Sequence, residues 1–166
     1  MYFFTLISVK MKKYIYLILF TALTATTVNA QVHTTYSLTQ EAYKKIIEAA
    51  KQHAKKNDSP RGSIAIVDAG GHLLYLERMD NTFPLSAELA FQKARTAVLF
   101  KNESKLFEGF VNSGSPSLTT IGIVMLQGGV PIIYKGEVIG AIGVSGAKSP
   151  DIDSEIAKVG ASTPLD

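Results

Sequence analysis

Residues 128–147 read GGVPIIYKGEVIGAIGVSGA, and this stretch determines the expected fold. It holds two β-rich runs, residues 130–134 and 138–144, joined by Lys135-Gly136-Glu137. Because glycine supplies the positive φ that a tight reversal needs, the stretch predicts a β-hairpin. The glycines at positions 140, 143 and 146 indicate a strand that another element approaches closely.

A second pair of β-rich runs lies upstream, at residues 63–67 and 73–77. These runs are separated by Asp68-Ala69-Gly70-Gly71, and the paired glycines again predict a tight turn. Hairpin connections are too short for the crossovers that parallel strands require. The two hairpins therefore predict an antiparallel sheet.

Three helical patterns flank the hairpins. Thr39 can cap a helix that runs to about Lys56, and Ser86 can cap a second one. Ser149 or Pro150 opens a last helix that runs to about Gly160. The first helix has apolar side chains at three- and four-residue spacing, at Tyr43, Ile46, Ile47, Ala50 and Ala54. The second has a face of mostly small residues, which suits close packing: Ala87, Ala90, Phe91, Ala94 and Val98.

The chain between the second helix and the second hairpin has weaker patterns. Residues 103–111 predict a short helix, and residues 112–117 predict a flexible linker. Residues 121–126 are apolar, and their length fits a strand or a helix. The order helix, hairpin, helix, hairpin, helix predicts an α+β (α/β) domain, with a central antiparallel sheet and helices on its faces.

Residues 1–30 have the pattern of a secretory signal peptide. Lys10, Lys12 and Lys13 precede an apolar stretch at residues 14–23, and a small polar segment ends at Ala30. The apolar stretch has about ten residues, fewer than the roughly 20 that span a bilayer, so we expect export without stable membrane insertion. Cleavage after Ala30 would leave an arm at residues 31–37 and one domain at residues 38–166, and translation could begin at Met1 or Met11.

Charge and composition exclude two classes of function. The first 30 residues hold three of the 17 basic side chains and none of the 14 acidic ones, so the remainder has no net charge. The basic surface typical of a nucleic-acid-binding protein is therefore not expected. The chain has no cysteine, which excludes disulfides, thiolate metal sites and a cysteine nucleophile, and is compatible with an oxidising periplasm.

Several spaced blocks occur together in one order. They are Leu38-Thr39, Arg78-Met79-Asp80, Lys93-Ala94, residues 128–132 and residues 138–147. With these blocks the chain resembles the GlcG/HbpS haem-binding family, which also forms the C-terminal domain of PduO-type proteins. The resemblance covers about residues 38–161. It implies a profilin-like α/β/α sandwich, binding of haem or another tetrapyrrole with its iron, and assembly into homo-oligomers, as dimers or rings of dimers.

The three histidines are candidate axial ligands to haem iron, since neutral imidazole can provide that bond. His53 lies at the edge of the apolar face of the first helix and ranks first, as a metal ligand or as a boundary residue. His33 lies in the arm, where a solvated role is the alternative. His72 follows Gly71 at the hairpin turn, where a turn role is the alternative.

Three further residues are candidates for ligand binding. Arg78 can bind a carboxylate such as a haem propionate or a small organic acid. Met79 can fill an irregular pocket or offer its thioether to iron. Lys93 belongs to the Lys-Ala block, and it can join Arg78 at a site or be a solvated helix lysine.

Two functions remain open at this point. The first is an exported haem-binding protein that sequesters, transports or senses its ligand. The alternative is a small-molecule enzyme or accessory factor for a small hydroxy acid or aldehyde, with Arg78 and Lys93 as anchors. The chain has no Gly-x-Ser-x-Gly elbow and no serine whose histidine and carboxylate partners are evident. A binding protein is therefore favoured over an enzyme, and an assembly role through subunit contacts alone is a third possibility.

Overall fold

The computed structural model describes Met11, Tyr14 and residues 34–165. Residues 35–165 belong to one compact unit, and Met11 and Tyr14, which are helical, belong to a second unit. The rest of the predicted signal peptide, the predicted cleavage point and His33 lie outside the described residues. Within the described residues, no helix combines the length and apolar character needed to cross a membrane.

The compact unit is built on a four-stranded antiparallel sheet with the strand order β2-β1-β4-β3. The strands are β1 (Ser63–Asp68), β2 (Leu73–Arg78), β3 (Gly129–Tyr134) and β4 (Glu137–Ser145). Both predicted hairpins are present, and β1 joins them by pairing with β4. The predicted α+β fold with a central antiparallel sheet is therefore confirmed.

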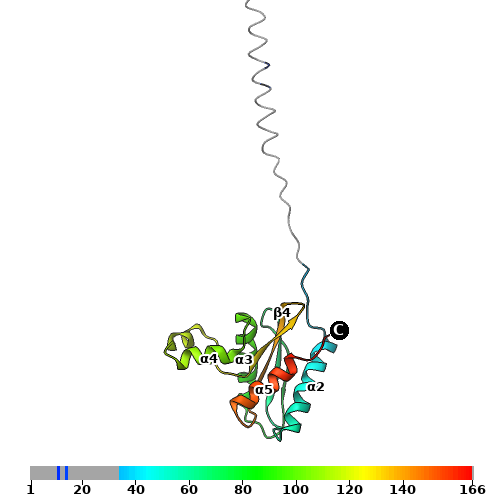
Figure 1. The fold of residues 1–166 in the computed structure, drawn as a ribbon, viewed down its shortest axis with the longest axis vertical. Coiled ribbons are helices and arrows are strands. Elements are labelled where there is room, and N and C mark those ends of the chain that lie inside the picture. The colour runs from blue at the N-terminus through cyan, green and yellow to red at the C-terminus, as the bar shows by residue number, and fades with distance from the viewer. Residues whose placement is uncertain (1–10, 12–13, 15–33, 166) are drawn as a thin grey trace, which may run out of the picture. The chain divides into compact units, whose positions relative to one another are not determined.

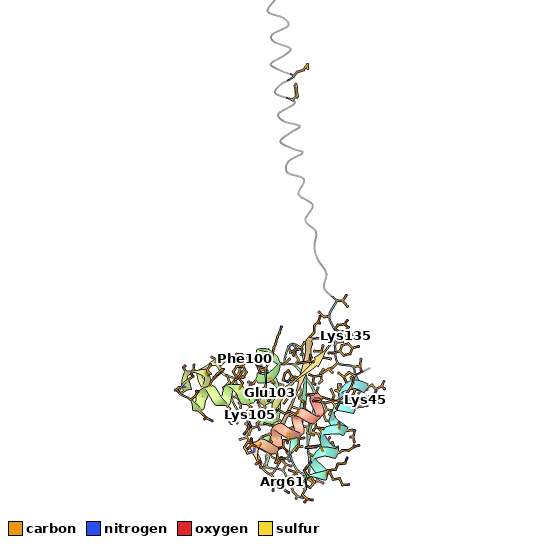
Figure 2. All side chains as sticks on the ribbon, in the orientation of Figure 1. Lys45, Arg61, Phe100, Glu103, Lys105 and Lys135 are labelled. Atoms are coloured by element: carbon orange, nitrogen blue, oxygen red, sulfur yellow. The ribbon has the colours of Figure 1, made fainter. Side chains whose placement is uncertain are left out.

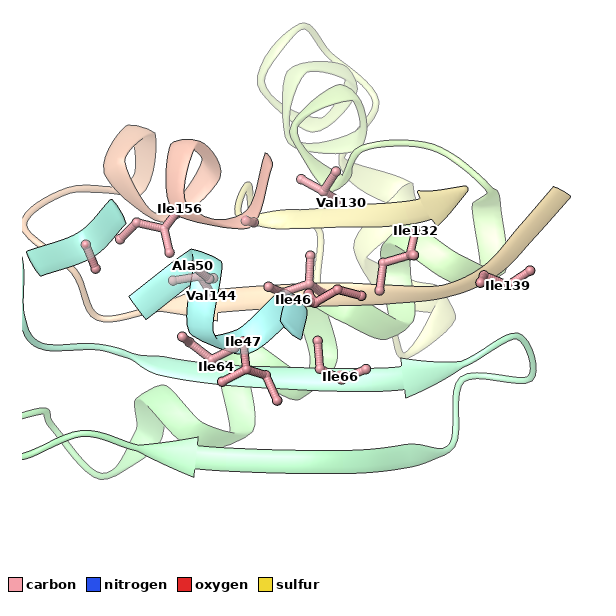
Figure 3. Close-up of a cluster of buried hydrophobic side chains, with 13 residues drawn as sticks. Ile46, Ile47, Ala50, Ile64, Ile66, Val130, Ile132, Ile139, Val144 and Ile156 are labelled. Atoms are coloured by element: carbon pink, nitrogen blue, oxygen red, sulfur yellow. The ribbon is translucent and has the colours of Figure 1, made fainter. Parts of the chain in front are cut away.

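One face of the sheet is covered by α2 (Gln40–Lys56) and α5 (Pro150–Ala161), as Figure 1 shows. Figure 3 shows the core between these two helices and the sheet, where side chains from both helices and from three strands pack together. Burial of each such side chain stabilises the fold by about 1.5–3 kcal/mol. The largest fully buried members of this core are Ile46, Ile64, Ile66, Ile132, Ile142, Ile156 and Val144.

The other face is covered by α3 (Leu85–Phe100), which packs unusually close to the sheet. A Cβ atom on Gly143 of β4 would overlap the carbonyl oxygen of Ala90, so only glycine fits there. Ala94, Ala97 and Ala141 complete the contact between helix and sheet. The predicted close approach to the glycine-containing strand is confirmed, and the element that approaches it at Gly143 is the small-residue face of α3.

Two of the three predicted helix caps are confirmed. Thr39 Oγ1 accepts a hydrogen bond from Ala42 N at 3.2 Å, and Ser149 Oγ accepts one from Ile152 N at 3.3 Å. The prediction for Ser86 is wrong, because α3 begins at Leu85 and has no side-chain cap. The Ser86 hydroxyl instead donates to Phe83 O at 2.6 Å and lies 2.7 Å from Ser63 Oγ, which ties α3 to β1.

The chain between α3 and β3 contains α4 (Ser104–Asn112) and the 3₁₀ helix η1 (Pro116–Ile121). Figure 1 shows α4 projecting away from the sheet. The predicted linker is shorter than expected, since α4 extends to Asn112 and η1 begins at Pro116. Residues 121–126, whose pattern fitted a strand or a helix, form neither a strand nor an α-helix. Ile121 ends η1, and the rest of the segment contacts α3, where Thr96 Oγ1 donates a hydrogen bond to Val124 O at 2.6 Å.

Candidate functional site

An ion pair lies inside the compact unit, where α3 meets α5. Lys93 Nζ is 3.0 Å from Asp153 Oδ2 and donates to Val144 O at 3.1 Å. Asp153 Oδ1 accepts a hydrogen bond from Ala147 N at 2.9 Å. Lys93 is only 3% exposed and Asp153 only 4%, so Lys93 is not the solvated helix lysine that the local pattern allowed. Its ammonium group donates to two protein oxygens, one of Asp153 and one of Val144.

The double glycine at the start of β3, Gly128-Gly129, packs against this ion pair. A Cβ atom on Gly128 would lie 3.1 Å from Lys93 Nζ and 2.6 Å from Val144 O, and Gly128 has a φ of 116°. A Cβ atom on Gly129 would overlap the backbone of Lys93, and the Gly129 N–H donates to Ser104 Oγ at 2.8 Å. The two glycines therefore allow close backbone packing around the buried lysine.

The structure places the candidate histidines apart. His53 is half-buried in the last turn of α2, where Asn57 Nδ2 lies 3.3 Å from its Nε2 and 3.5 Å from its Nδ1. His72 lies at the β1–β2 turn with its side chain 81% exposed, and its Nδ1 is 3.2 Å from Asp68 Oδ2. Since β1 runs from the end of α2 toward that turn, the two histidines lie toward opposite ends of the sheet.

Arg78 and Met79 also point to different places. Arg78 is exposed on β2 opposite Ser63, on the face of the sheet that carries α3. Met79 packs against the core on the other face. Arg78 and Lys93 therefore do not form one anchor for a carboxylate. Within the described part of the chain, no group of three or more histidine and carboxylate side chains is arranged to hold a metal ion.

Two neighbouring hollows lie around the C-terminal end of α5, and together we call them the α5 groove. Lys158 and Ser162 border both hollows, whose volumes are about 460 and 400 Å³. The first is also lined by Ala49, Val159, Thr163 and Pro164. The second is also lined by Glu103, Val130, Pro131, Ile133 and Ala161.

The α5 groove is apolar with a cation at its centre. Ile133 is 58% exposed and Val159 is 36% exposed, so both present apolar surface to a ligand. Lys158 Nζ lies 3.0 Å from Glu103 Oε2, and both side chains are partly exposed, so this pair contributes little stability. Glu103 is labelled in Figure 2, at the base of the projecting α4 region.

His53 lines neither hollow, but it lies near Ala49, which lines the first. It follows Ala49 by one helical turn on α2, and residues four apart share one face of a helix. The sequence did not single out Lys158, Val159 or Ile133, which line the groove. The groove combines residues from four separate elements, and no local pattern connects them.

A third hollow, of about 430 Å³, is lined mostly by polar and charged residues and lies where α2 ends and β1 begins; we call it the polar hollow. Arg61, labelled in Figure 2, lies at the end of the unit away from Lys135. The lining combines two cations with two carboxylates, and Ser59 in its wall is fully buried. The residues are Asp58, Ser59, Pro60, Arg61, Asp80, Asn81 and Lys148.

Comparisons with known proteins give consistent results. A family model described as haem degrading protein HbpS-like matches residues 38–162. Protein GlcG of Escherichia coli strain K12 is 44% identical over 109 residues, which cover 65% of this chain and 81% of that protein. The crystal structure of a double mutant of Streptomyces reticuli HbpS is 34% identical with a TM-score of 0.74, covering 86% of this chain and 99% of that chain.

A crystal structure of a PduOC–haem complex is also similar, with 28% identity and a TM-score of 0.69. The match covers 78% of this chain and 96% of that chain. The resemblance that the spaced blocks indicated is therefore confirmed, and the chain belongs to the HbpS-like family.

Proposed function

We propose that this protein binds haem in the α5 groove. The single observation that carries the proposal is an apolar groove with one central cation, in a chain whose family includes a protein solved with haem. Small-molecule sites are mostly apolar hollows of about 300–1,000 Å³ with a few polar groups that fix orientation. The groove fits that description.

Each part of the groove has a role in this proposal. The macrocycle would contact Val159, Ile133 and Pro164, which are apolar and accessible. Lys158 would pair with a propionate, because a partly exposed cation can exchange the Glu103 carboxylate for another at little cost. Binding of this kind serves haem sequestration, transport or sensing.

His53 is the residue that we propose as axial ligand to the iron. Its half-buried imidazole lies one helical turn from Ala49, which lines the groove. Asn57 Nδ2 contacts the ring, so iron ligation displaces this contact. Haem would supply the coordinating iron, and the protein would supply the nitrogen, the apolar surface and the cation.

Titration with haemin tests this assignment. We expect saturable binding with a shift of the Soret band, and we expect His53→Ala to change the position of the bound band. His72→Ala is the matched control, since that histidine is exposed at the β1–β2 turn, and it should leave the spectrum unchanged. A wild-type protein with no saturable spectral change would contradict haem binding. A His72→Ala effect without a His53→Ala effect would contradict the choice of ligand.

The polar hollow favours a second candidate function, recognition of a small hydroxy acid. Arg61 and Lys148 line this hollow, and neither forms an ion pair with a carboxylate within residues 34–165. They replace Arg78 and Lys93 as possible anchors for a carboxylate. Calorimetric titration with small hydroxy acids tests this: binding should be lost in Arg61→Ala and kept in Arg95→Ala. No heat at millimolar acid would exclude the second function.

We also propose that the protein is exported, to the periplasm or the medium. The support is the sequence of residues 1–30 alone. Cell fractionation and mass spectrometry of the purified protein test it, with an expected N-terminus at Gln31. Recovery of the protein in the cytoplasm with residues 11–30 still attached would contradict export.

A further inference from the structure

The two edges of the sheet differ in how well they are protected from further pairing. At the β3 edge, Pro131 has no N–H to donate, and the N–H of Gly129 is bound by Ser104 Oγ. At the other edge, β2 (LLYLER) contains no proline and no lysine. Among the described strands it pairs only with β1. Proline and a bound outward N–H therefore block the β3 edge, and β2 has neither of these devices.

The hydrogen bonds to β1 show which groups of β2 are unpaired. Met79 N donates to Gly62 O at 3.0 Å, and this pair continues the register that places Ser63 opposite Arg78. Successive residues of a strand direct their backbone groups to alternate sides. Leu76 and Arg78 therefore direct their N–H and C=O groups away from the sheet.

Exposed leucines accompany this unpaired edge. Leu76 lies opposite Ala65, on the face of the sheet that carries α3, and is 41% exposed. Leu74 is 36% exposed and Leu73 is 45% exposed. A strand that combines unpaired backbone groups with exposed leucines fits another strand of apolar character.

We propose that β2 pairs antiparallel with β2 of a second copy of this chain, with Leu76 opposite Leu76 at the two-fold axis. The two four-stranded sheets then join into one continuous sheet. A second copy is the fitting partner, because an isologous contact presents the same unpaired edge from both sides. The leucines that are exposed in one copy then cover each other.

Charge excludes two of the possible registers. If the two copies paired about Glu77, two carboxylates would lie directly opposite each other. If they paired about Arg78, two guanidinium groups would do so, and like charges directly opposite each other are unfavourable. Pairing about Leu76 avoids both and places Arg78 opposite Leu74. It also uses the regular part of β2, because the irregularity in the β1–β2 ladder lies between Ile66 and Val67, beyond Tyr75.

A single cysteine tests this contact, since the chain has none of its own. Directly opposed residues of a hydrogen-bonded pair have Cα atoms about 5.5 Å apart, which is within the range that a disulfide bridges. We expect Leu76→Cys, in protein purified as the cell makes it, to form a covalent dimer on mild oxidation. Lys44→Cys, on the exposed side of α2, is the control and should remain largely monomeric on the gel. Equal cross-linking of the two variants would overturn the proposal.

Light scattering gives an independent readout. We expect Leu76→Lys to raise the dissociation constant of self-association at least about tenfold, because like charges then oppose each other at the axis. Circular dichroism checks that this variant stays folded, as an exposed position allows. A wild-type protein that is monomeric at all concentrations, or a Leu76→Lys variant with unchanged association, would overturn the proposal. The haemin titration is unaffected by either result, since the α5 groove uses none of these residues.

Discussion

Lys93 Nζ and Asp153 Oδ2 lie 3.0 Å apart in the interior, and their contacts hold three elements together. Lys93 belongs to α3, Asp153 belongs to α5, and both contact the backbone at the end of β4 through Val144 and Ala147. α5 carries most of the proposed haem groove on its other end. The buried ion pair therefore positions the groove without touching a ligand.

We predict that Asp153→Ala destabilises the protein by about 3–5 kcal/mol, because it leaves a buried ammonium group without its partner. The double variant Lys93→Met with Asp153→Leu should recover much of that loss, since replacing both charges by apolar groups leaves no buried charge unpaired. Urea denaturation of the single and double variants measures the coupling. A single variant within about 1 kcal/mol of the wild type would contradict a tightly coupled pair.

Two glycine-to-alanine variants should have opposite effects. Gly143→Ala places a Cβ atom against the backbone of Ala90, so we expect a loss of about 1–3 kcal/mol or more as α3 is pushed from the sheet. Gly109→Ala lies in α4 with no other atom near the added Cβ, so we expect a gain of up to about 1 kcal/mol. Thermal unfolding compares the two. If Gly143→Ala lowered the Tm no more than Gly109→Ala does, the close packing of α3 on Gly143 would be contradicted.

The network of Lys51, Tyr75 and Glu77 gives a prediction on pH. Glu77 Oε1 lies 2.8 Å from Lys51 Nζ, and Tyr75 donates to Glu77 Oε2 at 2.6 Å. The hydrogen bonds from Lys51 and Tyr75 lower the pKa of Glu77. Its contribution to stability is therefore present above the usual glutamate pKa of about 4.3, and is lost as the pH falls through the lower pKa of the folded state.

The same network acts in the opposite direction on the phenol. The hydrogen bond to Glu77, with some burial, raises the pKa of Tyr75 to about 12. That contribution is present below pH about 10, and is lost as the pH rises toward 12. We expect Glu77→Gln to cost about 1 kcal/mol at neutral pH and to lower the pKa of Tyr75. Denaturation across pH and a titration of phenolate absorbance measure these effects, and an unchanged phenolate titration would contradict the contact.

Local sequence patterns were enough to predict the helices and hairpins. Contacts between residues that lie far apart in the sequence could not be predicted from such patterns. Thr39 and the apolar spacing of α2 lie within one helix, and both hairpin turns lie beside their strands, so these elements could be found directly. Lys93 was predicted to bind a ligand or to be a solvated helix lysine, and its burial could not be predicted because its partner lies 60 positions away. The α5 groove was missed for the same reason, since Ala49, Glu103, Ile133 and Lys158 meet only in the folded chain.

Lys158 provides the last test of the groove. If its ammonium group pairs with a haem propionate, Lys158→Met should weaken haemin binding by about tenfold, while stability changes little because the pair with Glu103 is partly exposed. Lys105→Met is the matched control, since Lys105 also forms an exposed pair, with Asp151, but does not line the groove. The pair of variants separates a local contact from a general loss of positive charge. Equal weakening in both would assign the effect to net charge and would remove Lys158 from the site.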